Sequence, residues 1–282
     1  FGRVQKNYFY VGNGSGGDVS APYSINLVQG LVNAGVQLDS TVLAAYESWC
    51  TASVNDPDPG FWGHWPRYYA EMPVKQDWVQ AAAKRCQTAV VVIGRSAGED
   101  RENTLKKGSF YLTNKEKALL DAVTAAFQKV VLVLNIGSIM DFAEIDAYGD
   151  KISAILLAWQ LGMESGNAVA DVLTGQVNPS GRLTDTIAKT YADYPAQNFG
   201  NKAENRYTED IFVGYRYFET FAPERVLYPF GYGLSYTDFT CKVTKTETKD
   251  QTVSVQVQVE NTGALPGKQV VQLYACCPCG AL

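Results

Sequence analysis

Three short, uninterrupted apolar runs constrain the fold of this chain more than any other feature of its sequence. They are residues 89–93, 130–134 and 154–158. Strands buried on both faces have such continuous apolarity, whereas half-exposed strands alternate apolar and polar residues. The residues around these runs, at 79–84, 113–128 and 166–173, have helical patterns. This alternation of strands and helices predicts an α/β fold with a largely parallel sheet flanked by helices.

Local signals add detail to this α/β part. Thr113 is predicted to cap a helix at its N-terminus, with Glu116 completing a capping box. Residues 9–11 are predicted to end a strand, and residues 25–32 and 42–49 to form helices. Residues 55–73 form a long loop rich in aromatic side chains, and its length favours a functional or interface role.

The pattern changes after residue 238. Residues 253–259 alternate apolar and polar side chains, as a half-exposed antiparallel strand does, and residues 270–274 are predicted to start another strand. A β-sandwich domain needs about seven strands. We therefore expect a truncated β-sandwich segment here, and a natural polypeptide that continues past Leu282. Because the chain opens with Phe1 rather than Met, residues before it are also expected.

Composition excludes several function classes. The net charge is −5, so there is no basic footprint for nucleic acid. No apolar run approaches the roughly 20 residues of a membrane span, and no membrane association is expected. The six cysteines and the single histidine, His64, do not have the spacing of a zinc site, so no metal is predicted. Reduced thiols of a cytosolic protein are favoured over a disulfide framework.

Residues 12–17 match the letters of a dinucleotide-binding fingerprint, G-x-G-x-x-G. However, Pro22 stands where the following helix should already be running, and no strand precedes Asp39. A glycine-rich turn at the edge of a sheet is therefore favoured over a nucleotide site. Serine hydrolysis is also disfavoured, since its triad would need His64 and no G-x-S-x-G elbow follows a strand.

The loop at residues 94–102 is the first candidate for a functional site. It directly follows the buried run 89–93 and contains Glu99, Asp100, Arg101 and Glu102. Ligands of open parallel sheets bind at the carboxyl ends of the strands, and a carboxyl group there can be tuned as an acid or base by burial or by an arginine. From composition alone, a solvated charged loop is the more frequent alternative. Trp159, after the third run, fits stacking on a sugar and core packing equally well.

A set of segments in fixed order resembles one known family. They are residues 94–101, 135–137, 158–160, 170–173, 178–183, 213–218 and 228–237. Together they resemble the α/β-sandwich domain of glycoside hydrolase family 3, the β-glucosidases and their relatives. Residues 239–282 resemble the start of the fibronectin type III-like domain that follows it. The resemblance therefore implies two domains, 1–238 and 239–282, and it removes the dinucleotide interpretation.

The resemblance also implies a chemistry. Family members are retaining glycosidases, so this chain is expected to belong to a β-glucosidase that hydrolyses terminal non-reducing β-D-glucosyl residues of a β-glucoside or oligosaccharide. Glu99 matches the acid/base, and Glu102 is the alternative because the spacing here is shorter. Asp100, Arg101 and Trp159 are the expected substrate-binding residues.

The family's nucleophile is an aspartate on a (β/α)8 barrel, which this sequence lacks. That barrel is the expected partner, from the same polypeptide, and the chain alone is expected to be inactive. No cofactor is expected. The likeness to bacterial members suggests the bacterial cytoplasm. A non-catalytic carbohydrate-binding or scaffolding module is the alternative function.

Overall fold

The computed structural model describes residues 1–17, 19–52, 60, 64–99, 101, 103–196 and 203–276. The chain divides into two compact units, Phe1–Thr174 and Gly175–Leu282. In the part of the chain that is described, no helix has both the length and the apolar character that crossing a membrane requires.

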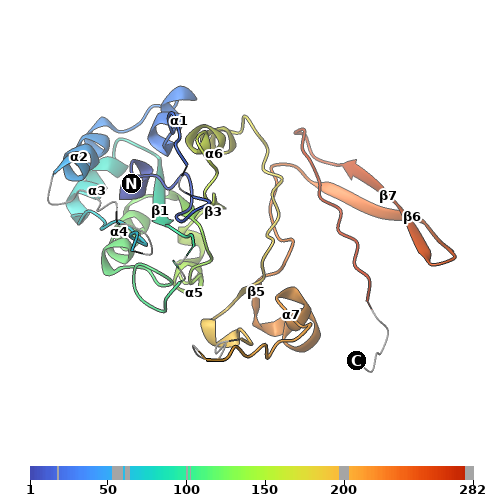
Figure 1. Cartoon of the computed structure of the whole chain (residues 1–282). Coiled ribbons are helices and arrows are strands. Elements are labelled where there is room, and N and C mark those ends of the chain that lie inside the picture. The colour runs from blue at the N-terminus through green and yellow to red at the C-terminus, as the bar shows by residue number, and fades with distance from the viewer. Residues whose placement is uncertain are drawn as a thin grey trace. The chain divides into compact units, whose positions relative to one another are not determined.

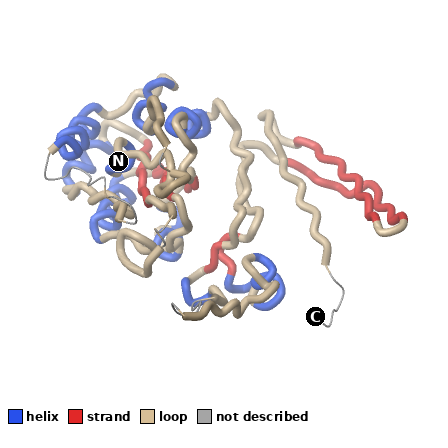
Figure 2. The backbone as a smooth tube through the Cα atoms, viewed as in Figure 1, coloured by secondary structure: helices blue, strands red, loops and turns tan. Residues whose placement is uncertain are grey.

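A three-stranded parallel sheet is the centre of the first unit (Figures 1 and 2). Its strands are β1 (Thr88–Arg95), β2 (Lys129–Ile136) and β3 (Ala154–Leu157), in the order β1-β2-β3. Val91 and Leu132 are completely buried where the sheet is covered on both faces. The three predicted strands and the α/β class are thus confirmed. β1 and β2 are buried on both faces as predicted, whereas the residues of β3 are half-buried or exposed.

Helices surround this sheet (Figure 2). They are α1 (Leu27–Asn33), α2 (Ser40–Thr51), α3 (Gln76–Ala83), α4 (Asn114–Ala126), α5 (Ala143–Asp146) and α6 (Ser165–Thr174), with 3-10 turns η1 (Arg3–Gln5) and η3 (Gly149–Lys151). The predicted capping box of α4 is confirmed: the Glu116 N–H donates to Thr113 Oγ1 at 3.1 Å, and the Thr113 N–H donates to Glu116 Oε2 at 2.7 Å.

Helices α1 and α6 meet backbone to backbone and lie side by side in Figure 1. A Cβ atom added to Gly30 would lie 2.0 Å from the Gly166 carbonyl oxygen, and one added to Gly166 would lie 2.0 Å from that of Asn26. Any side chain at either glycine would force the helices apart. The two glycines therefore set how closely α6, which follows β3, packs against α1.

The second unit contains two antiparallel strand pairs. β4 (Ile187–Ala188) pairs with β5 (Val226–Tyr228), near α7 (Tyr215–Phe221), η4 (Tyr191–Asp193) and η5 (Pro223–Arg225). β6 (Phe239–Lys249) and β7 (Thr252–Asn261) form a hairpin. In β7, Val255 and Val257 are partly covered while their neighbours are exposed, which confirms the predicted period of two in the middle of the strand. Val253 and Val259, at the ends of the predicted run, are exposed.

Two predicted strands are wrong. Residues 9–11 form no ladder, because the side-chain amide of Asn135 takes both backbone groups of Phe9: the Phe9 N–H donates to Asn135 Oδ1 at 2.7 Å, and Asn135 Nδ2 donates to the Phe9 carbonyl at 2.8 Å. Residues 270–274 are also not a strand. A strand exists only through pairing, and among the described residues that segment has no ladder partner.

Candidate active site

The carboxyl ends of β1, β2 and β3 meet at one edge of the sheet, because parallel strands end on the same side. The Gly137 N–H, after β2, donates to the Arg95 carbonyl at the end of β1 at 3.0 Å. After β3, the Ala158 N–H donates to the Leu134 carbonyl at 2.9 Å. This edge is where ligands of open α/β sheets bind, and it is the edge from which the Glu99 loop leaves.

Glu99 is exposed on this loop and is held by the glycine-rich turn at residues 12–17. Its Oε2 atom accepts two hydrogen bonds from Ser15, from the N–H at 2.9 Å and from Oγ at 2.5 Å. These bonds, the side-chain one first and the backbone one second, lower the pKa of the Glu99 carboxyl. In this chain Glu99 is therefore stabilised as a carboxylate at neutral pH.

Backbone contacts fix the glycine-rich turn against the Glu99 loop. The Asn13 N–H donates to the Ala97 carbonyl at 2.8 Å, and the Glu99 N–H donates to the Asn13 carbonyl at 3.1 Å. A Cβ atom on Gly98 would lie 2.0 Å from the Asn13 oxygen, and one on Gly14 would lie 2.4 Å from the Glu99 Cβ. The glycines of the fingerprint-like sequence therefore allow close approach to the Glu99 loop.

The two neighbours of Glu99 in the predicted acidic set, Asp100 and Glu102, lie outside the described residues. Arg101 is half-buried, and its Nε atom is buried without a hydrogen-bond partner among the described residues. Burial, and next the charge of Arg67, lower the pKa of the Arg101 guanidinium. Arg101 thus places a half-buried guanidinium on the Glu99 loop, two residues after Glu99.

Trp159 follows β3 at the same edge and is half-buried. Its backbone has a φ of +41°, which is a strained conformation for a bulky residue. Asn135 Nδ2 donates to the Trp159 carbonyl at 2.6 Å and so anchors the turn. The next side chain, Gln160, lies against Gly137: a Cβ atom on Gly137 would be 2.5 Å from Gln160 Oε1 and 2.6 Å from the Ala97 Cβ. The Trp159 turn and the Glu99 loop therefore meet at Gly137.

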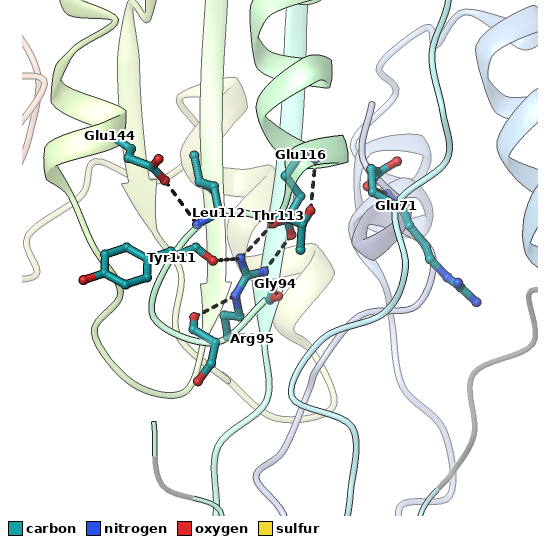
Figure 3. A network of polar contacts seen from close by, with 10 residues as sticks. Glu71, Gly94, Arg95, Tyr111, Leu112, Thr113, Glu116 and Glu144 are labelled. Carbon is teal, nitrogen blue, oxygen red and sulfur yellow. Dashed lines mark hydrogen bonds and ion pairs between the residues drawn. The ribbon is translucent and has the colours of Figure 1, made fainter. Parts of the chain in front are cut away.

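The other arginine of the predicted charged loop, Arg95, belongs to the core. It is 1% exposed, and its guanidinium forms a double ion pair with Glu116, Nη1 to Oε1 at 2.6 Å and Nη2 to Oε2 at 2.8 Å. Its remaining N–H groups donate to the carbonyl oxygens of Gly94, Ser109 and Tyr111 (Figure 3). Every donor of the guanidinium is used. Arg95 thus links the end of β1, where the Glu99 loop begins, to the N-terminus of α4.

The described end of the aromatic-rich loop, residues 64–73, lies beside this edge. The Ser96 N–H, directly after β1, donates to the Arg67 carbonyl at 2.8 Å. Tyr68 fills the space over Gly108, and Tyr69 stacks on Phe9 with ring centroids 4.8 Å apart. The rest of the predicted loop is only partly described, so a functional role for the whole loop stays a prediction.

Sequence reasoning missed one buried carboxyl group, Glu71. It is 4% exposed and accepts hydrogen bonds from the Arg3 N–H at 2.8 Å, the Met72 N–H at 2.9 Å and the Tyr46 hydroxyl at 3.1 Å. Burial raises the pKa of Glu71, against these hydrogen bonds. Because its oxygens are engaged by the chain itself, Glu71 is a structural group (labelled in Figure 3). In the sequence Glu71 stands between Ala70 and Met72, and no local pattern there signals a buried carboxyl group.

No group of three or more histidine, cysteine, aspartate or glutamate side chains in the described part of the chain could hold a metal ion. The fold and the site thus define an α/β domain that presents an exposed carboxylate at the carboxyl edge of a parallel sheet.

Comparison with known proteins places this domain in a family. Residues 1–236 match the family described as the glycosyl hydrolase family 3 C-terminal domain. The chain therefore belongs to glycosyl hydrolase family 3, as its C-terminal domain.

Several family members with solved structures or curated sequences are similar over most of this chain. A β-glucosidase of Ruminococcus albus is 44% identical over 275 residues, which are 97% of this chain and 29% of that protein. A β-glucosidase structure from Paenibacillus barengoltzii has a TM-score of 0.89 and 43% identity, covering 93% of this chain and 29% of that one. β-Glucosidase 3B of Thermotoga neapolitana in complex with glucose has a TM-score of 0.82 at 34% identity, covering 93% of this chain and 37% of that one. This chain thus spans less than two fifths of each relative.

Proposed function

We propose that this chain supplies the acid/base carboxylate, Glu99, of a retaining β-glucosidase that hydrolyses terminal non-reducing β-D-glucosyl residues. The observation that carries the proposal is the place of Glu99: it is exposed and held by Ser15 at the carboxyl edge of a parallel sheet. The similarity to β-glucosidases over 97% of the chain supports the substrate class.

In a retaining mechanism, two carboxyl groups about 5–5.5 Å apart divide the work. Glu99 would first donate its proton to the glycosidic oxygen while a nucleophile forms the glycosyl-enzyme. It would then take a proton from the water that releases the sugar. The nucleophile would come from the barrel domain, which is the proposed partner of this chain within a longer polypeptide.

The lowered pKa of Glu99 bears on this role. A general acid has to be protonated when the substrate binds, whereas the Ser15 hydrogen bonds favour the carboxylate. A second carboxylate within about 5–5.5 Å disfavours ionisation of the first and raises its pKa. The proposal therefore requires the barrel's nucleophile to do two things: to attack the sugar, and to raise the pKa of Glu99 by its negative charge.

Three neighbours complete the proposed site. Arg101, a half-buried cation on the same loop, would position or tune Glu99, together with Asp100. Trp159, at its strained turn, would stack on a sugar face, since aromatic rings bind apolar C–H surfaces. The proposal keeps the two domains expected from the resemblance, 1–238 as an α/β sandwich and 239–282 as part of a fibronectin type III-like domain.

The test uses the longer polypeptide that contains this chain and a barrel. Glu99→Ala should lower turnover of unactivated β-glucosides by about 10²–10⁴-fold, and azide should restore turnover of activated aryl glucosides. Glu164→Ala is the matched control, because Glu164 is another exposed glutamate at this edge. If Glu102→Ala, and not Glu99→Ala, shows the azide effect, the role passes to Glu102.

The 282-residue chain by itself provides a second test. It should not hydrolyse an aryl β-glucoside, because one carboxyl group cannot perform a double displacement. Measurable turnover by the purified chain, unchanged in Glu99→Ala, would contradict the proposed division of labour. Normal hydrolysis by the long polypeptide carrying Glu99→Ala and Glu102→Ala would instead favour a non-catalytic carbohydrate-binding module.

A further inference from the structure

We infer that Ser15 is a positioning residue for Glu99: it occupies Oε2 of the carboxyl group and so leaves Oε1 as the oxygen that exchanges protons with the substrate. This inference rests on the proposed acid/base role of Glu99. It assigns a task to the glycine-rich turn at residues 12–17, for which the sequence predicts only a turn at the edge of a sheet.

The contact geometry distinguishes the two oxygens of Glu99. Oε2 accepts both hydrogen bonds from Ser15, at 2.9 Å from the N–H and at 2.5 Å from Oγ. Oε1 has no hydrogen-bond partner among the described residues. An oxygen that already accepts two donors has little room for a proton, whereas the other oxygen is free to carry one.

The turn is built to hold Ser15 in this place. Gly14 has a φ of +102°, and its missing side chain leaves the Glu99 Cβ room at 2.4 Å from where its own Cβ would be. At Asn13, two residues before Ser15, the bond from its N–H to the Ala97 carbonyl and the bond from the Glu99 N–H to its carbonyl fix the register of the two segments. Ser15 therefore faces Glu99 through three backbone constraints and not through one flexible side chain.

Among the residues that the structure describes, Ser15 has the largest influence on the pKa of Glu99. Residues 12–17 contain no charged side chain. On the loop of Glu99 itself, the other described charged groups are Arg95, which is paired with Glu116 in the core, and Arg101. The charge of Arg67 acts on Arg101, whose pKa it helps to lower. The lowered pKa of Glu99 has the Ser15 side chain as its first cause and the Ser15 N–H as its second, while burial opposes them.

The assignment is consistent with both halves of the reaction. In the first, the proton on Oε1 passes to the glycosidic oxygen as the bond to the leaving group breaks, and Glu99 becomes a carboxylate. In the second, Oε1 takes a proton from water as the water oxygen bonds to the sugar, and the bond between the sugar and the barrel's nucleophile breaks and releases that carboxylate. Ser15 donates to Oε2 throughout, so it stabilises the carboxylate between the two steps without itself losing a proton.

The first experiment measures the Glu99 carboxyl directly, in the 282-residue chain. Carboxyl ¹³C NMR, with Glu99→Gln to assign the signal, gives the titration midpoint in the native chain and in Ser15→Ala, Ser15→Thr and Ser20→Ala. Ser15→Ala should raise the midpoint, because the largest stabilisation of the carboxylate is gone. Ser15→Thr keeps the hydroxyl and should restore it. Ser20, an exposed serine in the following segment, should have no effect.

The second experiment measures the pH dependence of kcat/KM in the long polypeptide with the same variants. With Ser15→Ala the basic limb should move to higher pH, so that the rate on that limb, relative to the optimum, rises on the order of three- to tenfold. An NMR midpoint that does not move in Ser15→Ala overturns the inference, whatever the function of Glu99. If the midpoint moves in Ser15→Ala while the pH profile of kcat/KM does not, Ser15 holds Glu99 but has no part in the reaction, and the inference is overturned. The azide test on Glu99→Ala decides separately whether the proposed acid/base role of Glu99 also fails.

Discussion

Asn135 binds the backbone of Phe9 across 126 residues of sequence, with its side-chain oxygen and nitrogen accepting from the N–H and donating to the carbonyl of the same residue. The same amide nitrogen also donates to the Trp159 carbonyl. One completely buried side chain at the end of β2 thus joins the segment that leads into the glycine-rich turn to the strained turn after β3.

Replacing this amide should destabilise the first unit. Asn135→Leu leaves buried backbone groups of Phe9 and Trp159 without partners, and we expect a loss of about 2–3 kcal/mol in the free energy of unfolding. Urea denaturation followed by tryptophan fluorescence measures it, because all five tryptophans lie before residue 175. Asn33→Leu removes an exposed amide and is the control. Equal stability of the native chain and Asn135→Leu would contradict the anchor.

The Arg95 and Glu116 pair should show the asymmetry of buried ion pairs. Arg95→Met leaves a buried carboxylate unpaired and should cost about 3–5 kcal/mol, whereas the double variant Arg95→Met with Glu116→Leu should recover much of that loss. The same tryptophan-detected urea denaturation applies. At the exposed pair of Arg206 and Glu204, Arg206→Met should change stability by less than about 1 kcal/mol, by whole-chain calorimetry. If Arg95→Met were at least as stable as the double variant, the ion pair of Arg95 and Glu116 would not be desolvated.

Replacing Gly98, on the Glu99 loop, should lower activity, whereas replacing Gly16, in the glycine-rich turn, should not. Gly98→Ala puts a methyl group where the Asn13 oxygen lies, so the two segments must separate and Glu99 loses Ser15. Gly16→Ala, in the same turn, meets nothing within 4 Å and is the matched control. In the long polypeptide we expect Gly98→Ala to lower kcat by at least about tenfold, and Gly16→Ala to leave it unchanged. Equal activity of the two variants would mean that the contact is not needed.

Glu71 should make stability depend on pH. Burial raises its folded pKa above the unfolded value, so the folded state holds its proton more tightly. The contribution of Glu71 is therefore fully present below the unfolded pKa and is lost as pH rises through the folded one. Glu71→Gln cannot titrate and should flatten this decline, although it is less stable throughout because an amide N–H₂ faces a backbone N–H. Urea denaturation between pH 4 and pH 7, about the range of a raised carboxyl pKa, measures the slopes, and parallel slopes would contradict the assignment.

The interior strands and helices could be predicted from the sequence because residues that are neighbours in the chain determine them. The apolar runs that became β1 and β2 are buried on both faces, and the Thr113 and Glu116 capping box involves residues three positions apart. Even the loop that carries Glu99 followed from the rule that ligands bind at the carboxyl ends of parallel strands. Each of these inferences depends on neighbours in the chain or on the direction of the strands.

What needed the tertiary structure was every contact between distant segments. Phe9 is not in a strand because an amide 126 residues away satisfies its backbone, and Arg95 proved to be a core residue because Glu116 and three carbonyl groups surround it. Ser15 and Glu99 are 84 positions apart, so no local pattern could pair them. The sequence by itself determined the interior strands and helices and pointed to the candidate carboxylate. Only the folded chain decided which backbone and side-chain groups hold that carboxylate, because hydrogen bonds form between groups that are close in space, whatever their separation along the chain.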